Sequence, residues 1–276
     1  MSIYYVDGRY VPAEEAVIPV DDLSIMRGLG VFDFMRTFGG KPHFLKEHVA
    51  RLENSAREIG LELPWTQAEI VEIVTTTLEK NQLSEANIRI VITGGSSPDF
   101  ITPQGKPRLL VLVTPISPPP PEWYTDGVKI MTVKSGRNLP EAKSIDYIRA
   151  TMALRQAKKI GAVEAIYLDE NRNALEGTTS NIFAVIDGVL VTPGQNILPG
   201  ITRKAVVAMG RNLMEVRIGN LPIDDLVKAD EVFITGSGKG LVPVVQVDDH
   251  IIASGRPGPK TRLLIEAMAR QIKSGG

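Results

Sequence analysis

The sequence predicts an α+β protein built from two domains. Strand and helix signals are mixed in both halves of the chain, and a run of four prolines separates the two sets of signals. The prolines lie in Ile116–Glu122, where they favour extended backbone and donate no sheet hydrogen bonds, as expected for a connection between domains. We therefore expect a small N-terminal domain over residues 1–115, a linker over 116–125 and a larger C-terminal domain over 126–276.

The first half of the chain contains a hairpin signal and a helix-start signal. Asp7-Gly8 lies between two short β-prone runs, the pattern typical of a two-residue hairpin turn. Thr66 followed by Glu69 forms a capping box, which predicts that a helix begins there. Periodicity and β-propensity extend these signals to helices over Leu45–Ile59 and Gln67–Asn81 and strands over Ile88–Thr93 and Leu109–Val113.

The second half of the chain alternates strands with helices. Ser144 is a candidate helix cap, Gly161 a candidate helix stop, and Asp187-Gly188 a second hairpin turn. The expected helices cover Ser144–Ile160, Ile201–Met214, Asp224–Lys228 and Thr261–Ile272. The expected strands cover Val128–Val133, Val163–Leu168, Asn181–Ile186, Val189–Val191, Glu231–Thr235, Val244–Val247 and Ile251–Ala253.

Composition excludes several classes of function. The chain has 31 basic and 32 acidic residues, so no global field attracts nucleic acid or an anionic membrane. It has no cysteine, and its three histidines lack metal-ligand spacing, so we expect no disulfide and no metal site. There is neither a signal-peptide pattern nor an apolar run of membrane-spanning length, and we expect a cytoplasmic protein.

Three segments of the second half carry residues suited to chemistry. They are Lys143-Ser-Ile-Asp-Tyr147, Glu176-Gly-Thr-Thr-Ser-Asn181 and Leu198-Pro-Gly-Ile-Thr-Arg203. Taken alone, the lysine reads as a solvated side chain and the glutamate as a surface turn acid. The third segment is a glycine turn at a predicted helix start, where unpaired backbone N–H groups and the helix dipole favour an anion.

Together, these segments resemble those of the class IV pyridoxal-phosphate enzymes, which share fold type IV. That family includes the D-amino acid and branched-chain transaminases and aminodeoxychorismate lyase. The resemblance covers Tyr4 to Arg262 and implies the two-domain fold of the family, with a small N-terminal and a larger C-terminal α/β domain. It implies that Lys143 carries pyridoxal 5′-phosphate as a Schiff base and that Glu176 faces the pyridine nitrogen.

The resemblance assigns further cofactor contacts. The backbone N–H groups of Ile201 and Thr202, and the Thr202 hydroxyl, match the family's phosphate site, and so does Ser237. Arg51 matches the family's phosphate-binding arginine, although a surface salt bridge is the ordinary role of such a residue. Tyr147 matches a tyrosine near the phenolic oxygen of the cofactor in branched-chain enzymes. Asp146 departs from the asparagine that is usual in the family.

The glycine-rich segment Gly236-Ser-Gly-Lys-Gly240 is a weak nucleotide signal. Lys239 is followed by glycine rather than by serine or threonine, and no helix is predicted after it, so it matches neither a Walker loop nor a dinucleotide fingerprint. A glycine-rich nest beside a phosphate fits the transaminase better. Lys239 and Gly240 are departures from the family, and we expect Lys239 to be solvated rather than a contact to a substrate carboxylate.

Two arginines are candidates for substrate binding. Arg27 precedes a segment similar to the family's substrate pocket, and alternation along Ile88–Ile92 places Arg89 on the face opposite the isoleucines. The pair resembles an atypical subgroup of D-amino acid transaminases, so we favour D-amino acids over branched-chain L-amino acids. A salt bridge from Arg27 to Asp21, Asp22 or Asp33 is the structural alternative.

The sequence therefore predicts a pyridoxal-phosphate-dependent transaminase that acts on an amino acid and a 2-oxo acid such as 2-oxoglutarate. Lys143 would act as the acid and base in ping-pong chemistry, and the resemblance implies a homodimer. Branched-chain L-amino acid transamination and aminodeoxychorismate lyase activity are alternatives. A non-enzymatic phosphate- or nucleotide-binding protein is a remote one, because it leaves Lys143 and Glu176 unexplained.

Overall fold

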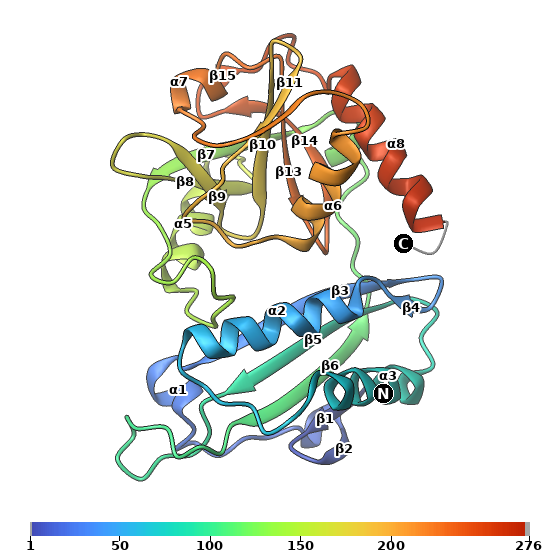
Figure 1. Cartoon of the computed structure of the whole chain (residues 1–276), viewed down its shortest axis with the longest axis vertical. Helices are drawn as coiled ribbons and strands as arrows, with labels where there is room; N and C mark the ends of the chain where they lie inside the picture. Colours follow the sequence, from blue (N-terminus) through green and yellow to red (C-terminus); the bar gives the residue numbers. More distant parts are fainter. Residues whose placement is uncertain (1, 274–276) are drawn as a thin grey trace. The chain divides into compact units, whose positions relative to one another are not determined.

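The computed structural model describes residues 2–273, and the chain divides into two compact units (Figure 1). The first unit comprises Met1–Ser117 and Glu141–Asp146, and the second comprises Pro118–Pro140 and Tyr147–Gly276. Met1 and residues 274–276, at the ends of the two predicted domains, lie outside the described residues. The short segment that contains Lys143 therefore packs with the first unit, although its neighbours in sequence belong to the second.

A six-stranded sheet forms the first unit, in the order β2-β1-β6-β5-β3-β4, and all five pairings are antiparallel. The strands are β1 (Ile3–Val6), β2 (Arg9–Pro12), β3 (Gly30–Phe38), β4 (Lys41–Pro42), β5 (Ala86–Thr93) and β6 (Arg108–Pro115). The helices are α1 (Leu23–Arg27), α2 (Leu45–Glu58) and α3 (Gln67–Asn81), with a 3-10 turn at Ala13–Glu15. The predicted Asp7-Gly8 hairpin is confirmed, because β1 and β2 pair across it.

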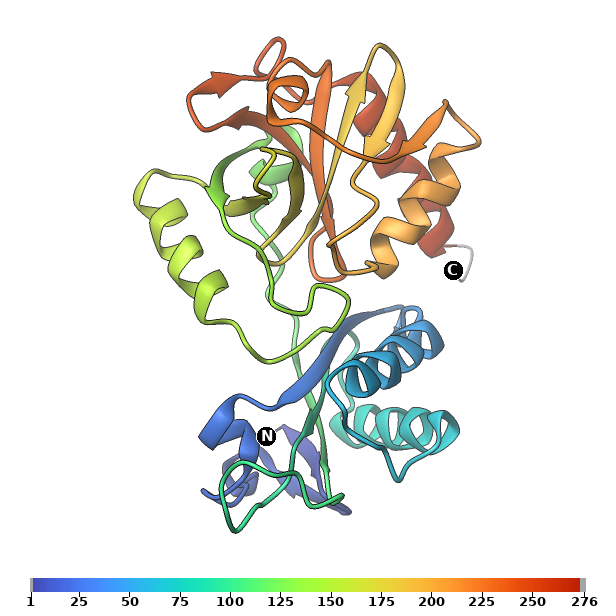
Figure 2. The ribbon, with the colours of Figure 1, turned by 60° about the vertical axis from the view of Figure 1, so that its left-hand side comes forward.

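Helices α2 and α3 lie side by side over one face of this sheet (Figures 1 and 2). The isoleucines of β5 point toward the helices and are fully buried, whereas Arg89 between them is exposed on the other face. The predicted alternation of this strand is therefore confirmed. The capping box is also confirmed, because the Thr66 hydroxyl accepts the Glu69 N–H and the Glu69 carboxylate accepts the Thr66 N–H.

The second unit is built on a nine-stranded sheet in the order β12-β11-β10-β13-β14-β7-β8-β9, with β15 paired to β14. An additional β9–β10 bridge between Glu176 and Asn181 closes six of these strands into a ring. The strands are β7 (Val128–Lys134), β8 (Glu164–Leu168), β9 (Ala174–Gly177), β10 (Asn181–Ile186), β11 (Val189–Thr192), β12 (Val216–Ile218), β13 (Glu231–Gly236), β14 (Gly240–Val247) and β15 (His250–Ile251).

Five helices surround this sheet. Helices α6 and α8 pack side by side against β13, and α5 packs against β7 and β8 (Figure 1). The helices are α4 (Glu122–Thr125), α5 (Ile148–Lys159), α6 (Ile201–Gly210), α7 (Ile223–Leu226) and α8 (Pro259–Lys273). Within residues 2–273, none of the helices is both long enough and apolar enough to cross a membrane.

The expected helix start at Ser144 is wrong. Helix α5 begins at Ile148, after Tyr147, and Ser144 instead pairs with Val31 in an isolated antiparallel bridge. The backbone of Ser144 is extended along the edge of β3, so it cannot also open a helix. The sequence contains the serine that favours a cap, but not the strand edge that competes with it.

Candidate functional site

The segment that carries Lys143 is fixed to two elements of the first unit. The Phe32 N–H donates to the Lys143 carbonyl at 2.9 Å, and the Ile145 N–H donates to the Gly30 carbonyl at 3.0 Å. The Lys143 N–H donates to the Ser55 hydroxyl on α2 at 3.0 Å, and that hydroxyl donates to the carbonyl one turn earlier in the helix. The backbone of Lys143 is thus held by both β3 and α2, which fixes where its side chain starts.

Lys143 and Arg89 both lie against the ring of Phe32. The Lys143 Nζ is 4.7 Å from the ring centroid, and the Arg89 Cζ is 5.1 Å from it. Arg89 also lies 5.5 Å from the ring of Phe34, its direct partner in the β3–β5 register. The aromatic face attracts both cations, so an amine and a guanidinium are held close to one another on the same side of the sheet.

Behind this face, Arg51 forms a buried ion pair. Its Nε and Nη2 donate to the two carboxylate oxygens of Asp33, at 2.9 and 2.8 Å, and the His48 Nδ1 lies 2.6 Å from Asp33 Oδ1. Burial raises the pKa of Asp33, but the Arg51 charge and the hydrogen bonds from His48 and Arg51 outweigh it, so the pKa lies far below the ordinary value. Burial lowers the pKa of His48, against the opposite effect of Asp33.

Arg27 occupies the last turn of α1 and is exposed. Its Nη1 donates to the Met26 carbonyl at 2.8 Å. The alternative role predicted for Arg27, a salt bridge to an aspartate, does not occur in the described structure, where Asp22 pairs with Arg108 and Asp33 with a different arginine. The Arg27 guanidinium is therefore open to solvent at the end of a short helix.

In the second unit, Glu176 ends β9 as predicted and is buried. Its Oε2 accepts the Leu198 N–H at 3.0 Å, and its Oε1 lies 3.6 Å from Nη1 of Arg137. Asn181 lies opposite Glu176 and donates from Nδ2 to the Leu198 carbonyl at 3.0 Å. The two ends of the Glu176–Asn181 segment therefore hold Leu198 by its N–H and its carbonyl.

The phosphate-site candidates lie where the sequence predicts them. Ile201 and Thr202 are the first two residues of α6, whose N-cap is Gly200. Any side chain at position 200 would collide with Oδ1 of Asn181, so the glycine is required by this packing. The N-cap position provides no side-chain hydrogen bond to the first turn of α6. The helix start thus keeps backbone donors for an anion.

Ser237 lies in the turn between β13 and β14, which form a hairpin rather than the strand–helix unit of a nucleotide loop. The expectation that Lys239 is solvated is wrong. Its side chain is 16% exposed, and its Nζ lies 3.1 Å from Oε2 of Glu164, which is 0% exposed. Glu164 is charged and buried, so it attracts the amine into the protein, and nothing near Lys239 in the sequence signals this partner.

Tyr147 is half-buried and is the residue immediately before α5. Its carbonyl accepts the first hydrogen bond of the helix, at 2.8 Å. Burial raises the pKa of the nearby Tyr167 hydroxyl to about 12, with contributions from Glu164 and Glu176. Tyr147, Tyr167, Arg137 and Glu176 are thus electrostatic neighbours in this unit.

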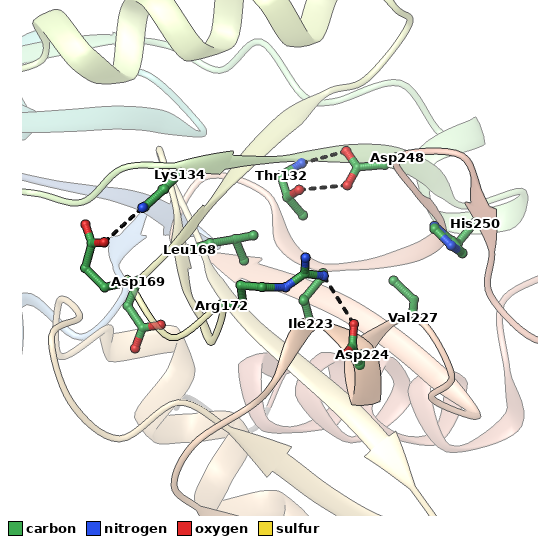
Figure 3. A pocket seen from close by; sticks show the side chains of 11 residues that line it. Thr132, Lys134, Leu168, Asp169, Arg172, Ile223, Asp224, Val227, Asp248 and His250 are labelled. Atoms are coloured by element: carbon green, nitrogen blue, oxygen red, sulfur yellow. Dashed lines mark hydrogen bonds and ion pairs between the residues drawn. The ribbon is translucent and has the colours of Figure 1, made fainter.

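A separate hollow of about 640 Å³ lies at another part of the second unit (Figure 3). Its charges are paired with one another: Lys134 with Glu170 at 2.9 Å, and Arg172 with Asp224 at 3.2 Å. At its rim, a further aspartate accepts the N–H and the hydroxyl of Thr132. None of the candidate residues lines this hollow.

Sequence reasoning missed the partners of the candidate residues. Arg137 beside Glu176, Asp33 beside Arg51 and Glu164 beside Lys239 were given no role. One signal existed for Glu164, because a charged residue opens an otherwise apolar strand. No local signal pairs Asp33 with Arg51, which are 18 residues apart on different elements.

Comparisons with known proteins agree with this arrangement. The family model of amino-transferase class IV matches residues 30–247. A Methanocaldococcus jannaschii protein provisionally named a branched-chain-amino-acid aminotransferase is 37% identical over 273 residues, covering 95% of this chain and 93% of that protein. The D-alanine aminotransferase of Staphylococcus epidermidis is 31% identical over 283 residues, covering 99% of both chains.

Two solved structures share the whole fold. The branched-chain amino acid aminotransferase of Escherichia coli superposes with a TM-score of 0.93 at 28% identity, over 98% of this chain and 94% of that one. A second branched-chain enzyme, whose source is abbreviated T.th. and which was solved with pyridoxamine 5′-phosphate, gives 0.92 at 29% identity over the same shares. The mixed α/β fold expected from the sequence is confirmed by these likenesses.

Proposed function

Because the chain belongs to the class IV aminotransferases, we propose that it moves an amino group from a D-amino acid to a 2-oxo acid such as 2-oxoglutarate, by a ping-pong mechanism. The observation that carries this proposal is the pair of cations on Phe32. Lys143 supplies an amine, and Arg89 lies on the same ring, where it can bind a substrate carboxylate.

The cofactor of class IV aminotransferases is pyridoxal 5′-phosphate, and the residues of this chain fit it. A phosphate dianion suits the uncapped start of α6 at Ile201 and Thr202, with the Ser237 hydroxyl as a further donor. Arg51 is a further phosphate ligand in this proposal, and its pairing with a buried aspartate fixes its guanidinium. A ring nitrogen suits the buried carboxylate of Glu176, and Tyr147 suits the phenolic oxygen.

When bound, pyridoxal phosphate acts as an electron sink for the electrons left on the substrate α-carbon. Lys143 is the residue that holds the cofactor, and its amine then takes the α-proton of the amino acid and delivers it to the C4′ carbon. Glu176 provides one fixed anion for the pyridine nitrogen, and the Leu198 N–H and Arg137 keep that carboxylate in place. The substrate carboxylates are bound by the two candidate arginines, Arg89 and Arg27.

A branched-chain L-amino acid is the second candidate donor, and two observations favour it. The M. jannaschii relative carries a branched-chain name, and Asn87-Ile88-Arg89 matches two of three positions of the branched-chain enzymes' Tyr-x-Arg motif. A branched-chain side chain would use apolar surface, whereas D-glutamate would need a cation for its second carboxylate. The exposed Arg27 supports the first candidate on this point.

We also propose that the active form is a homodimer. Ile148 and Met152 lie one turn apart on the same face of α5, and their side chains are 72% and 58% exposed. Leu139, just before this helix in sequence, is exposed as well. Apolar side chains grouped in this way support burial against a second copy of the chain. Sedimentation of the wild type and of I148E/M152E tests this, because a dimer that uses α5 should dissociate in the variant.

The donor is tested by a half-reaction that needs no second substrate. The cofactor-loaded protein is mixed separately with D-glutamate, D-alanine, L-glutamate and L-leucine, and its visible absorption spectrum is followed. Loss of the visible band with the D-compounds alone is the expected result. Loss with the L-compounds alone assigns the branched-chain reaction instead, and an unchanged spectrum with all four contradicts transamination of either kind.

A further inference from the structure

A buried carboxylate that the proposed mechanism does not use lies at the start of β8. Glu164 is fully buried, and its oxygens accept hydrogen bonds from the loop that follows Glu176. The donors are the Thr178 hydroxyl, the Thr179 N–H at 3.3 Å, the Thr179 hydroxyl at 2.7 Å and the Ser180 hydroxyl at 2.9 Å. Glu164 therefore fixes this loop by four hydrogen bonds rather than by apolar packing.

Lys239 joins the same carboxylate from a different part of the chain. Its Nζ donates to Glu164 at 3.1 Å and to the Thr179 hydroxyl at 2.9 Å. Its carbonyl accepts the Tyr124 hydroxyl at 2.8 Å, so both ends of the residue are tied. A Cβ on Gly236 would meet the Thr179 carbonyl at 3.2 Å, which shows how closely the turn and the loop approach.

The two tied segments carry different cofactor contacts in the proposed function. The turn over 236–240 contains Ser237, a candidate phosphate donor, and the loop over 178–180 directly follows Glu176 and Gly177. A change in the spacing between turn and loop would thus change the spacing between the phosphate contact and the ring contact. Lys239 is the side chain that bridges the two segments through one amine.

Resting on that function, we propose that Lys239 is a positioning residue that holds Ser237 and Glu176 at the spacing of the cofactor before the cofactor binds. Lys239 itself contacts neither the substrate nor the reacting atoms. Without the bridge, the turn samples other positions, and only part of the population can bind. The apparent dissociation constant of the cofactor rises by the inverse of the binding-competent fraction.

The test measures cofactor binding and apo stability in four variants. K239M removes the amine but keeps the length of the side chain, and K239R keeps a cation with several donors. K239M/E164Q removes both charges, so no uncompensated buried charge remains to destabilise the fold. K134M is the matched control, because Lys134 also pairs with a glutamate, but the pair is exposed. Each apo protein is titrated with pyridoxal phosphate, and its melting temperature is recorded.

We expect K239M and K239M/E164Q to raise the dissociation constant about tenfold, while K239R and K134M stay within about threefold of the wild type. The apo melting temperature of the double variant should match the wild type within about 3 °C, which separates positioning from loss of fold. Unchanged binding by K239M/E164Q overturns the proposal, and so does weakened binding that merely follows a lowered melting temperature. A wild type that does not bind pyridoxal phosphate contradicts the proposed function instead.

Discussion

The two units each bury a carboxylate in a strand, but they neutralise it in different ways. Asp33 on β3 receives two cationic side chains, Arg51 and His48, from the single helix α2. Glu164 on β8 receives hydroxyl groups from a loop and the amine of Lys239 from a hairpin turn. The first arrangement locks a helix onto a strand, and the second orders two irregular segments.

This difference matches where the candidate residues lie. In the first unit, Arg51 and Arg89 are on regular elements, whose hydrogen-bond ladders already fix them. In the second unit, Glu176, Thr202 and Ser237 lie at a strand end, a helix start and a turn. Loop positions need additional contacts to become rigid, and the buried carboxylate on β8 supplies them.

The largest effect should come from Lys143, the one candidate of the first unit whose role is chemical. Lys143→Ala should lower turnover by about 10⁴-fold or more, because both cofactor attachment and proton transfer are lost. Its backbone N–H still donates to Ser55, so the fold should be retained. Steady-state kinetics and circular dichroism measure the two properties, and near-normal turnover would refute the assigned role.

Breaking the first carboxylate site should cost more stability than breaking the second. Asp33→Ala leaves Arg51 and His48 buried without their anion, and we expect a loss of about 3–5 kcal/mol in the free energy of unfolding. Glu164→Ala leaves mainly hydroxyl groups, which can bond to water, and we expect about 1–3 kcal/mol. Urea denaturation of both variants measures the difference. Equal losses would contradict the distinction between a helix lock and a loop organiser.

The two arginines should differ in their effect on substrate binding. Arg89 lies against Phe32 and Phe34, so its guanidinium is already oriented, and Arg89→Ala should raise the KM for the acidic substrate about 10- to 100-fold. Arg27 is exposed at a helix end, and Arg27→Ala should raise it about tenfold or less. The absorbance of bound cofactor should be unchanged in both. Unchanged kinetics in both variants would remove the substrate assignment.

Acid should weaken both carboxylate sites by a smaller amount. Burial raises the pKa of Glu164, but Lys239 and three hydroxyls outweigh it, so the pKa is lowered in the fold, and that of Asp33 is lowered as well. Each group therefore contributes stability above its unfolded pKa, about 4, and this is lost as pH falls through the folded value. Between pH 5 and 3, E164Q should lose less stability than the wild type. An identical pH profile would contradict the assignment of a charged Glu164.

Local signals in the sequence predicted local structure well. The Asp7-Gly8 hairpin, the Thr66 capping box and the start of α6 at Ile201 depend on neighbouring residues and are confirmed. Strand β3 received no prediction, because Asp33 and Arg36 interrupt its apolar run, and the burial of the aspartate depends on partners elsewhere.

The misplaced elements of the site have the same physical origin. Ser144 pairs with Val31, and Lys239 pairs with Glu164, 75 residues away. Pairings of this length follow from the assembled sheet and leave no periodic trace in the sequence. The roles given to the candidate residues stay predictions, which the variants above test one at a time.

The most direct test of the account is to find which lysine carries the cofactor. The protein is incubated with pyridoxal phosphate and reduced with borohydride, which makes the attachment permanent, and its peptides are then mapped by mass spectrometry. The account predicts a single pyridoxyl group on Lys143, with Lys239 unmodified. Modification of Lys239 alone, or of no lysine at all, would contradict the central claim.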